Sequence, residues 1–186
     1  MNLPNKLTLM RVILVPFFVF FLLTDFVPFS KIIALAIFIA ASITDALDGH
    51  IARSRNLITT FGKFLDPIAD KVLVIAALTC FCELGIISSV PLLIIITREL
   101  VVDGLRLVTA NEGVVVAAGI WGKLKTAFTM VAEVVILLGL CFNFEGNMAE
   151  IANIVYQVLI WIATALTVIS GGVYLKGYWK YIDASK

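Results

Sequence analysis

Residues 31–53 read KIIALAIFIAASITDALDGHIAR, a nearly unbroken apolar run whose last nine residues include two aspartates, a glycine and an arginine. A helix needs about 20 mostly apolar residues to cross the hydrocarbon core of a bilayer. This run is long enough to do so, and it carries carboxylates at one end. It therefore predicts a membrane helix with a polar site at the edge of the bilayer.

The composition of the whole chain agrees with a membrane location. Of its 186 residues, 61% are hydrophobic and only 15% are charged, and the mean hydropathy is +1.07. Soluble domains are about half apolar and about a quarter charged. So small a globule cannot hide this excess of apolar surface. Because backbone groups in hydrocarbon need partners within their own segment, we expect an all-α integral membrane protein.

Six apolar runs separated by turn residues predict six transmembrane helices, which follow a short N-terminal interfacial segment over residues 1–8. No linker or composition change divides the chain, so residues 1–186 are expected to form a single domain. The expected spans are residues 9–23, 31–53, 66–84, 90–109, 123–142 and 151–178.

Basic residues are distributed unevenly between the two ends of these spans. Most Lys and Arg residues lie at the end that would carry both termini, whereas Lys31 is alone among acidic residues at the opposite end. Cytoplasmic loops are enriched in Lys and Arg. We therefore expect a multi-pass protein of the cell membrane with both termini and its site on the cytoplasmic side.

Four aspartates carry the strongest chemical signal. Asp45 and Asp48 end the second expected span, while Asp66 and Asp70 begin the third. Spacings of three and four residues place each pair on one helical face. An Asp inside a membrane helix costs roughly 2.5–3.5 kcal/mol on insertion scales, and such residues are usually functional. Pro67 would fit the first turn of the third helix, with Asp66 as its N-cap.

Four carboxylates in one place repel each other unless cations neutralise them. Helices joined by a short loop are antiparallel neighbours, so the two pairs can face each other. Ligands that are all oxygen suit Mg²⁺, Mn²⁺ or Ca²⁺ rather than zinc. Pairs of divalent ions are typical of displacement at phosphorus, where they clamp the attacking and leaving oxygens. The alternative is that each aspartate only caps a helix or pairs with a nearby basic side chain.

The aspartates belong to a longer pattern with fixed spacing. It reads Asp45-x-x-Asp48-Gly49-x-x-Ala52-Arg53, then eight residues, then Gly62-x-x-x-Asp66-x-x-x-Asp70. This pattern resembles the signature of the CDP-alcohol phosphotransferases. The resemblance implies a six-helix fold, usually a homodimer, with a metal site at the cytoplasmic boundary of the membrane.

The resemblance also implies a role for each of these positions. The four aspartates, Asp45, Asp48, Asp66 and Asp70, would hold two divalent cations, Mg²⁺ or Mn²⁺. Asp70 would in addition act as the base that deprotonates the acceptor hydroxyl. The site for CDP-diacylglycerol would be lined by Gly49, Ala52, Arg53 and Gly62.

A second group of residues concerns the acceptor. Arg98 and Arg106 are eight residues apart, close to two helical turns, so they share a face of the fourth span. Arg98 lies away from the helix ends and is expected to pair with Glu99 or with an aspartate of the site. Lys123 and Lys125 begin the fifth span. Arg and Lys bind phosphate, so we expect these four basic residues to bind an acceptor phosphate. The alternative is that Arg106 and the two lysines are only anchors at the membrane surface.

Further motifs are spread over the chain up to about residue 130. They are Asn5-x-x-Thr8-x-x-Arg11, Asp66-Pro67-x-Ala69-Asp70-Lys71, Thr97-Arg98-Glu99, Gly104-Leu105-Arg106 and Gly122-Lys123-x-Lys125-Thr126. These motifs resemble the phosphatidylglycerophosphate synthase branch of the family. The resemblance implies transfer of a phosphatidyl group from CDP-diacylglycerol to glycerol 3-phosphate, with release of CMP. Other acceptors, namely phosphatidylglycerol, inositol phosphate or serine, stay open, as does a divalent-cation transporter that uses the aspartates as its ion site.

The chain after Val131 carries no motif that points to a function. Its aromatic residues Tyr174, Tyr178, Trp179 and Tyr181 are interpreted as a belt at the membrane interface, where such rings are enriched.

Overall fold

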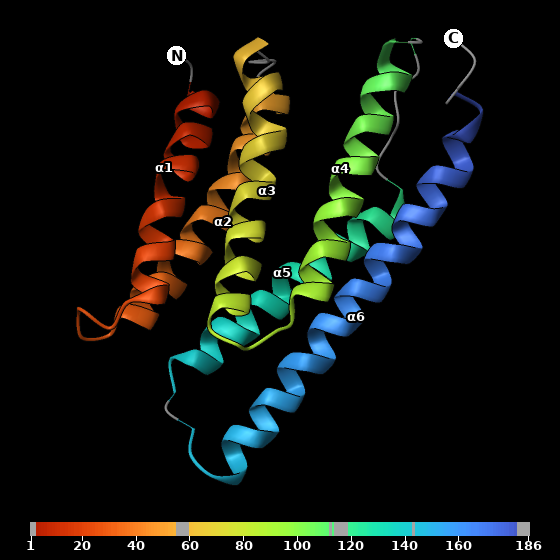
Figure 1. Ribbon diagram of the computed structural model, residues 1–186. Coiled ribbons are helices and arrows are strands. Elements are labelled where there is room, and N and C mark those ends of the chain that lie inside the picture. Colours follow the sequence, from red (N-terminus) through yellow and green to blue (C-terminus); the bar gives the residue numbers. More distant parts are fainter. Residues whose placement is uncertain (1–2, 55–59, 112, 114–118, 143, 182–186) are drawn as a thin grey trace.

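The computed structural model describes residues 3–54, 60–111, 113, 119–142 and 144–181, although some side chains near the ends of helices lie outside this description. All regular structure in these residues is helical, as the sequence predicted (Figure 1). The elements in chain order are α1 (Leu3–Leu23), α2 (Ser30–Ser54), α3 (Thr60–Glu83), α4 (Ser89–Asn111), α5 (Ile120–Leu140), α6 (Asn147–Tyr178) and the 3₁₀ helix η1 (Trp179–Tyr181).

The six α-helices coincide with the six apolar runs, but α1 begins earlier than predicted. It starts at Leu3, so residues 3–8 of the expected interfacial segment are part of the same continuous helix. Asn5, Thr8 and Arg11 are buried along one face of this first part of the helix. Hydropathy alone suggested an interfacial segment, because it does not show that polar side chains are covered by neighbouring helices.

The start of α3 also differs from the prediction. The helix begins at Thr60, so Asp66 is not its N-cap and Pro67 lies beyond its first turn. The expectation was wrong because it took the start of the apolar run as the start of the helix. Asp66 is thus a position within a helix rather than at its end.

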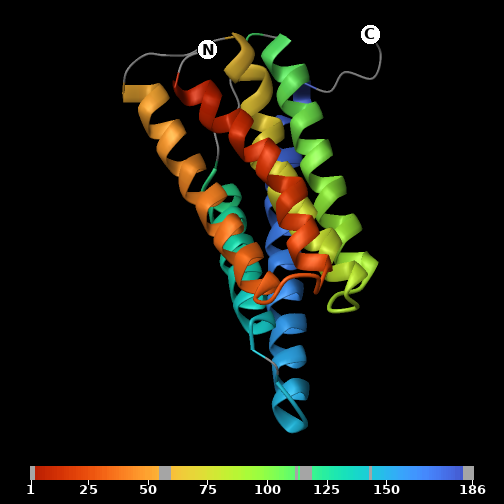
Figure 2. The ribbon, with the colours of Figure 1, turned by 90° about the vertical axis from the view of Figure 1, so that its left-hand side faces the viewer.

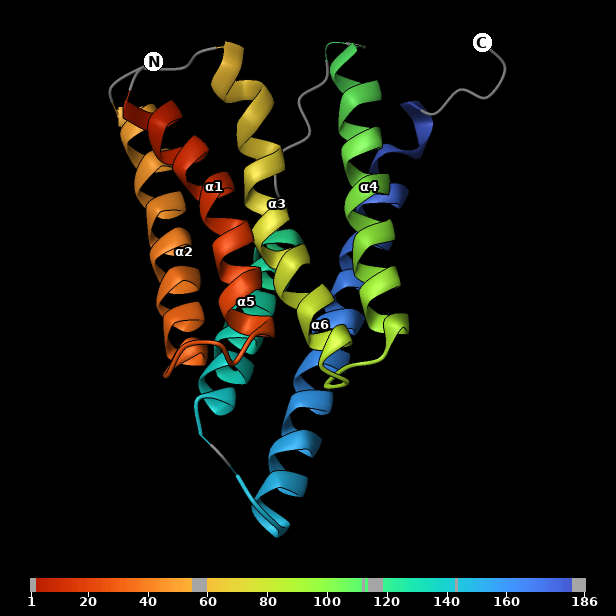
Figure 3. The ribbon, with the colours of Figure 1, turned by 60° about the vertical axis from the view of Figure 1, so that its left-hand side comes forward.

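The helices form two groups, which are joined by α5 and by the contact of α3 with α4. α1 packs against α2 and α3, whereas α6 packs against α4 and α5. α5 also contacts α2 and α3, and the three views show it behind these helices, with the turn between α5 and α6 projecting beyond the others (Figures 1, 2 and 3). The start of α1, the end of α2, the start of α3 and the end of α4 lie at one end of the molecule.

The core lies where these helices meet. Phe18 of α1 is fully buried against Phe38 of α2, with ring centroids 5.6 Å apart. Phe81, Ile136 and Ile160 bring α3, α5 and α6 to the same cluster. Between helices in a membrane, association is driven by van der Waals packing rather than by exclusion of water. The match of these side-chain shapes therefore holds the bundle together.

Gly85 sets the turn that returns the chain from α3 to α4. Its φ is +70°, a conformation that residues with a Cβ adopt at a steric cost. The N–H of Gly85 donates to the Cys82 carbonyl, and the N–H of Ile86 donates to the Phe81 carbonyl. This pairing ends α3 and lets α4 run back beside it.

The outer surface is strongly apolar. Within the described chain, the stretches Asn5–Leu23 and Asn147–Tyr178 are long and apolar enough to cross a membrane, with mean hydropathies of 2.1 and 2.0. α4 fails this test, yet its Leu93, Leu100 and Leu107 are 61%, 66% and 67% exposed. Such a surface is that of a membrane protein, while six spans stay a prediction.

Candidate active site

A basic cavity of about 670 Å³ lies between α3, α4, α5 and α6. Five cationic side chains and one carboxylate line it, together with threonine, tyrosine and apolar residues. Such a cavity is suited to a small anionic ligand, because fixed positive charges attract it and the apolar walls exclude competing water. Its charged residues are Lys71, Arg98, Glu99, Arg106, Lys123 and Lys125.

Glu99 is the central partner of these cations. Its Oε1 accepts hydrogen bonds from Nζ of Lys125 at 2.6 Å and from a terminal nitrogen of Arg98 at 2.8 Å. Nζ of Lys71 lies 3.9 Å from Oε2 of Glu99 and also forms an ion pair with Asp103. The predicted pairing of Arg98 with Glu99 is therefore confirmed. One carboxylate is surrounded by three cations, so the cavity keeps an excess of positive charge.

The two arginines of α4 share a wall of the cavity, as their spacing predicted. Cζ of Arg98 lies 5.6 Å from the ring centroid of Tyr174, and Cζ of Arg106 lies 5.7 Å from the same centroid. Arg98 also donates a hydrogen bond to Oγ of Ser170 at 2.6 Å. Both contacts come from α6, so this helix takes part in the cavity although its sequence carried no recognised motif.

Lys123 and Lys125 differ in their surroundings although both begin α5. Lys123 is exposed, whereas Lys125 is only 5% exposed and is paired with Glu99. All four basic residues expected at the acceptor site, including Arg98 and Arg106, thus line a single cavity. Their binding of a phosphate stays a prediction.

The sequence reasoning missed Lys71 and Tyr174 as cavity residues. Lys71 stood in the quoted motif Asp70-Lys71, and its place in the chain directly after Asp70 was the available signal. Tyr174 was assigned to an interfacial belt, which is wrong, because only 5% of the residue is exposed. Trp179, by contrast, is 64% exposed. Hydropathy could not separate these two aromatic residues.

The aspartate signature lies on two consecutive helices, near the end of the first and the start of the second. Asp45 and Asp48 are in the last turns of α2, while Asp66 and Asp70 are near the start of α3. α2 and α3 are in contact, and these ends lie on the same side of the molecule (Figure 2). The four aspartate side chains are outside the described residues. Elsewhere in the described chain, no three His, Cys, Asp or Glu residues gather as metal ligands.

The expected nucleotide-binding positions are only partly described. Gly62, near the start of α3, is buried. The side chains of Ala52 and Arg53, and the surroundings of Gly49, lie outside the described residues, although all three belong to α2. Their contact with CDP-diacylglycerol therefore stays a prediction.

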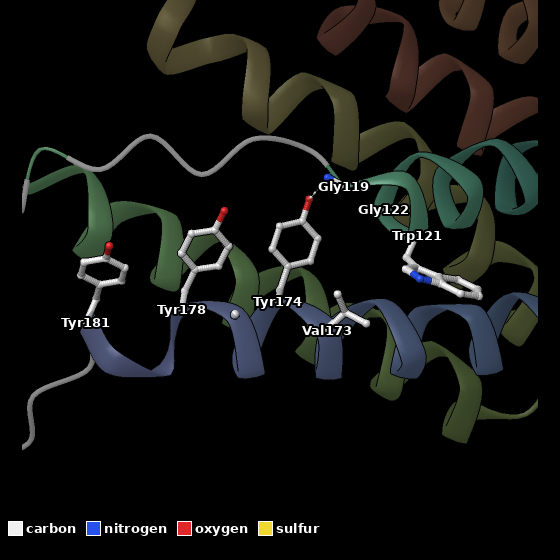
Figure 4. Close-up of a pocket in the computed structure, with 8 residues that line it drawn as sticks. Gly119, Trp121, Gly122, Val173, Tyr174, Tyr178 and Tyr181 are labelled. Atoms are coloured by element: carbon white, nitrogen blue, oxygen red, sulfur yellow. Dashed lines mark hydrogen bonds between the residues drawn. The ribbon is translucent and has the colours of Figure 1, made fainter.

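A second, aromatic cavity of about 360 Å³ adjoins the basic one. Tyr174 and Gly122 line both cavities, so the tyrosine ring is part of the wall between them. Figure 4 shows Tyr174, Tyr178 and Tyr181 projecting in a row from α6 and η1, with the hydroxyl of Tyr174 directed at Gly119. The N–H of Gly119 donates to this hydroxyl at 3.0 Å.

The fold and the cavity define a class of protein, a membrane-associated helical bundle with a basic cavity suited to a small anionic ligand. Comparison with known proteins makes this class specific. The CDP-alcohol phosphatidyltransferase family matches residues 1–169. The chain belongs to this family.

Relatives resemble the chain over nearly its whole length, and each of those described here bears the name CDP-diacylglycerol–glycerol-3-phosphate 3-phosphatidyltransferase. The protein of Bacillus subtilis is 40% identical over 99% of this chain and 98% of its own. That of Rickettsia bellii is 38% identical over 97% of each. That of Haemophilus influenzae is 41% identical over 94% of this chain and 92% of its own. Nothing in these matches points to the divalent-cation transporter considered from the sequence.

Proposed function

We propose that this protein transfers a phosphatidyl group from CDP-diacylglycerol to glycerol 3-phosphate, giving phosphatidylglycerophosphate and CMP. The family assignment and the names of its relatives support this reaction. The basic cavity is the observation that carries the choice of acceptor. A phosphate-bearing alcohol would neutralise the excess positive charge of this cavity, in which five cations and one carboxylate form the charged lining, whereas serine, a zwitterion, or free glycerol would not.

The donor set of the aspartates fits two divalent cations, Mg²⁺ or Mn²⁺. Asp45, Asp48, Asp66 and Asp70 offer only carboxylate oxygens, which hard cations prefer. When bound, these ions would neutralise negative charge on the pyrophosphate of CDP-diacylglycerol. Gly49, Ala52, Arg53 and Gly62 would contact the CDP moiety, and Arg53 would add positive charge at the same end of α2.

The acceptor would be held between this group and the basic cavity. Lys71 directly follows Asp70 and lines the cavity, so the cavity begins next to the backbone of the proposed base. Arg98, Arg106, Lys123 and Lys125 would bind the phosphate of glycerol 3-phosphate and direct its sn-1 hydroxyl toward Asp70. Asp70 would take the hydroxyl proton as the oxygen attacks the β-phosphorus and CMP leaves.

We further propose that residues 1–186 form one domain with six transmembrane helices, placed in the cell membrane with both termini and the site on the cytoplasmic side. The start of α1, the end of α2, the start of α3 and the end of α4 lie at one end of the molecule. Because glycerol 3-phosphate is soluble, it would have to reach the site at this end from the cytoplasm. At the other end, Lys31 is paired with Asp25 and adds little net charge. A homodimer is proposed from family resemblance.

The decisive experiment measures CMP release by the purified protein with CDP-diacylglycerol and a panel of acceptors. The panel contains glycerol 3-phosphate, glycerol, inositol phosphate, serine and phosphatidylglycerol. We expect turnover with glycerol 3-phosphate and a lipid product that carries a terminal phosphate. A clear preference for another member of the panel would replace the acceptor and leave the family chemistry in place. An absence of CMP release with every acceptor would overturn the proposal.

A further inference from the structure

The last turns of α6 contact both arginines of the basic cavity. Ser170 and Tyr174 supply these contacts, and both residues follow residue 169, where the family match ends. They also lie in the part of the chain in which the sequence showed no motif. Their position raises the question of what α6 contributes to the cavity.

Tyr174 is held firmly in place. Only 5% of the residue is exposed, and it packs against Val102 and Leu105 of α4. Its hydroxyl accepts a hydrogen bond from the N–H of Gly119, and its ring stacks on that of Tyr178 with centroids 6.4 Å apart. The ring is thus a rigid surface fixed from three sides.

Two glycines allow this close packing. A Cβ on Gly122 of α5 would lie 3.1 Å from the Tyr174 hydroxyl and 3.3 Å from a ring carbon. A Cβ on Gly171 of α6 would lie 3.1 Å from Cγ of Arg98. Both distances are tighter than ordinary van der Waals contacts. Small residues at these positions let the ring and the arginine stem lie against their neighbours.

We propose that Tyr174 is a positioning residue for the acceptor. Its ring holds the guanidinium groups of Arg98 and Arg106 at one wall of the basic cavity, where they meet the acceptor phosphate. This inference rests on the proposed function, since it concerns the same cavity. It assigns to α6 the task of arranging the phosphate-binding groups of α4.

The physical basis is the attraction between a cation and the face of an aromatic ring. Two like-charged guanidinium groups on one helix repel each other and would spread apart in the absence of a ligand. A ring whose centroid lies within 6 Å of both gives each group a favourable position near the other. Less conformational freedom then has to be lost when phosphate binds, which strengthens binding.

The test compares Tyr174→Leu, Tyr174→Phe and, as a control, Trp179→Leu in the adjoining η1, where the residue is 64% exposed. We expect Tyr174→Leu to raise KM for glycerol 3-phosphate about tenfold, from the attraction lost at two arginines. KM for CDP-diacylglycerol should change less than about twofold. Tyr174→Phe keeps the ring and should restore KM to within about threefold of the parent. Trp179→Leu removes an aromatic ring for which no contact with Tyr174 or with either arginine is found among the described residues, and should leave KM unchanged.

A double variant shows whether the ring acts through an arginine. Tyr174→Leu combined with Arg106→Ala should raise KM by much less than the product of the two single effects, because each change removes part of the same arrangement. Effects that multiply, or an unchanged KM for glycerol 3-phosphate in Tyr174→Leu, would overturn the inference. Tyr174→Met, which fills more of the space without an aromatic face, replaces Leu if that variant does not fold.

Failure of the proposed function can be told apart from failure of this inference. If the parent protein did not use glycerol 3-phosphate, binding of inorganic phosphate would be measured instead, by titration calorimetry on parent and Tyr174→Leu protein. Phosphate binding weakened about tenfold in the variant would support the positioning role even so. Equal affinities would overturn it.

Discussion

Nζ of Lys125 donates a hydrogen bond to Oε1 of Glu99 at 2.6 Å, and this pair joins α5 to α4 inside a cavity that is otherwise basic. Lys125 is buried, and 13% of the Glu99 side chain is exposed. The pair therefore has two roles that can be separated by experiment. It stabilises the contact between the two helices, and it offsets positive charge that an acceptor phosphate would otherwise meet.

Replacing Glu99 by Gln should destabilise the protein, because Lys125 and Arg98 lose the carboxylate to which they donate. We expect the free energy of unfolding to fall by about 1–3 kcal/mol, the range for a buried polar group left without its partner. Added glycerol 3-phosphate should raise Tm more in this variant than in the parent, since the ligand's charge replaces that of Glu99. Asp103→Asn is the matched control, because the Asp103 side chain is 40% exposed and Lys71 is the ion-pair partner found for it among the described residues. Equal Tm values for Glu99→Gln and parent would contradict this account.

Arg106→Ala should weaken binding of the acceptor without affecting binding of the lipid substrate. Arg106 contacts the ring of Tyr174, and no ion pair involving it is found among the described residues. The loss of one charge-assisted contact to phosphate, worth roughly 1.5–3 kcal/mol, should raise KM for glycerol 3-phosphate by one to two decades. Steady-state kinetics with each substrate varied in turn provide the measurement. Lys125→Ala is less informative, because it also removes the partner of Glu99. Unchanged acceptor kinetics in Arg106→Ala would remove this arginine from the site.

Asp70→Asn should abolish turnover and retain measurable binding of CDP-diacylglycerol. The amide preserves the shape of the side chain but cannot accept the proton of the acceptor hydroxyl at neutral pH. Asp45→Asn, by contrast, should weaken binding of metal and of CDP-diacylglycerol, because a carboxylate ligand is lost. Product formation and lipid binding would be measured on the same preparations. Turnover of Asp70→Asn at the parental rate would show that another group is the base.

Activity should depend on a divalent cation. Protein treated with a chelator is expected to be inactive and to recover when Mg²⁺ or Mn²⁺ is added, since four carboxylates repel an anionic substrate when no cation is bound. Zn²⁺ should restore activity less well, because the donor set lacks sulfur and imidazole. Metal content by mass spectrometry, measured beside CMP release, provides the check. Full activity in excess chelator, with no metal bound, would exclude the two-cation proposal.

Gly139→Ala should destabilise the contact between α5 and α6. A Cβ at this position would come within 2.7 Å of Cζ of Tyr156, whose side chain is buried between the helices. Overpacking of this kind typically lowers the free energy of unfolding by about 1–3 kcal/mol. Gly172→Ala on α6 is the control, since a Cβ there meets no atom within 4 Å. Thermal unfolding in detergent would compare the two, and equal Tm values would show that Tyr156 moves aside freely.

Much of the fold could be predicted because apolar runs report helices directly. The sixth run, residues 151–178, became α6 over Asn147–Tyr178 with only its start displaced. The predicted starts of α1 and α3 were wrong, because polar residues that precede the apolar run belong to the helix in both cases. Hydropathy describes a residue's preference for lipid or water, and it does not reveal a polar residue such as Thr8 that is covered by another helix.

Part of the candidate site could also be predicted from the sequence. The aspartate spacing and the eight-residue interval between Arg98 and Arg106 could be read from the chain, because helical periodicity places such residues on one face. The family signature around Asp45 and Asp70 likewise rested on sequence alone, and the match to residues 1–169 confirms the family.

The sequence by itself determined that the chain is helical, apolar on its outside and a member of a family that uses CDP-linked substrates. Only the tertiary structure decided that Glu99 pairs with Lys125, and that Tyr174 is buried against Arg98 and Arg106. The physical reason is that periodicity identifies the residues that share a face of one helix, but not the helix that this face meets. That choice depends on close packing between distant segments, such as Gly122 of α5 against Tyr174 of α6.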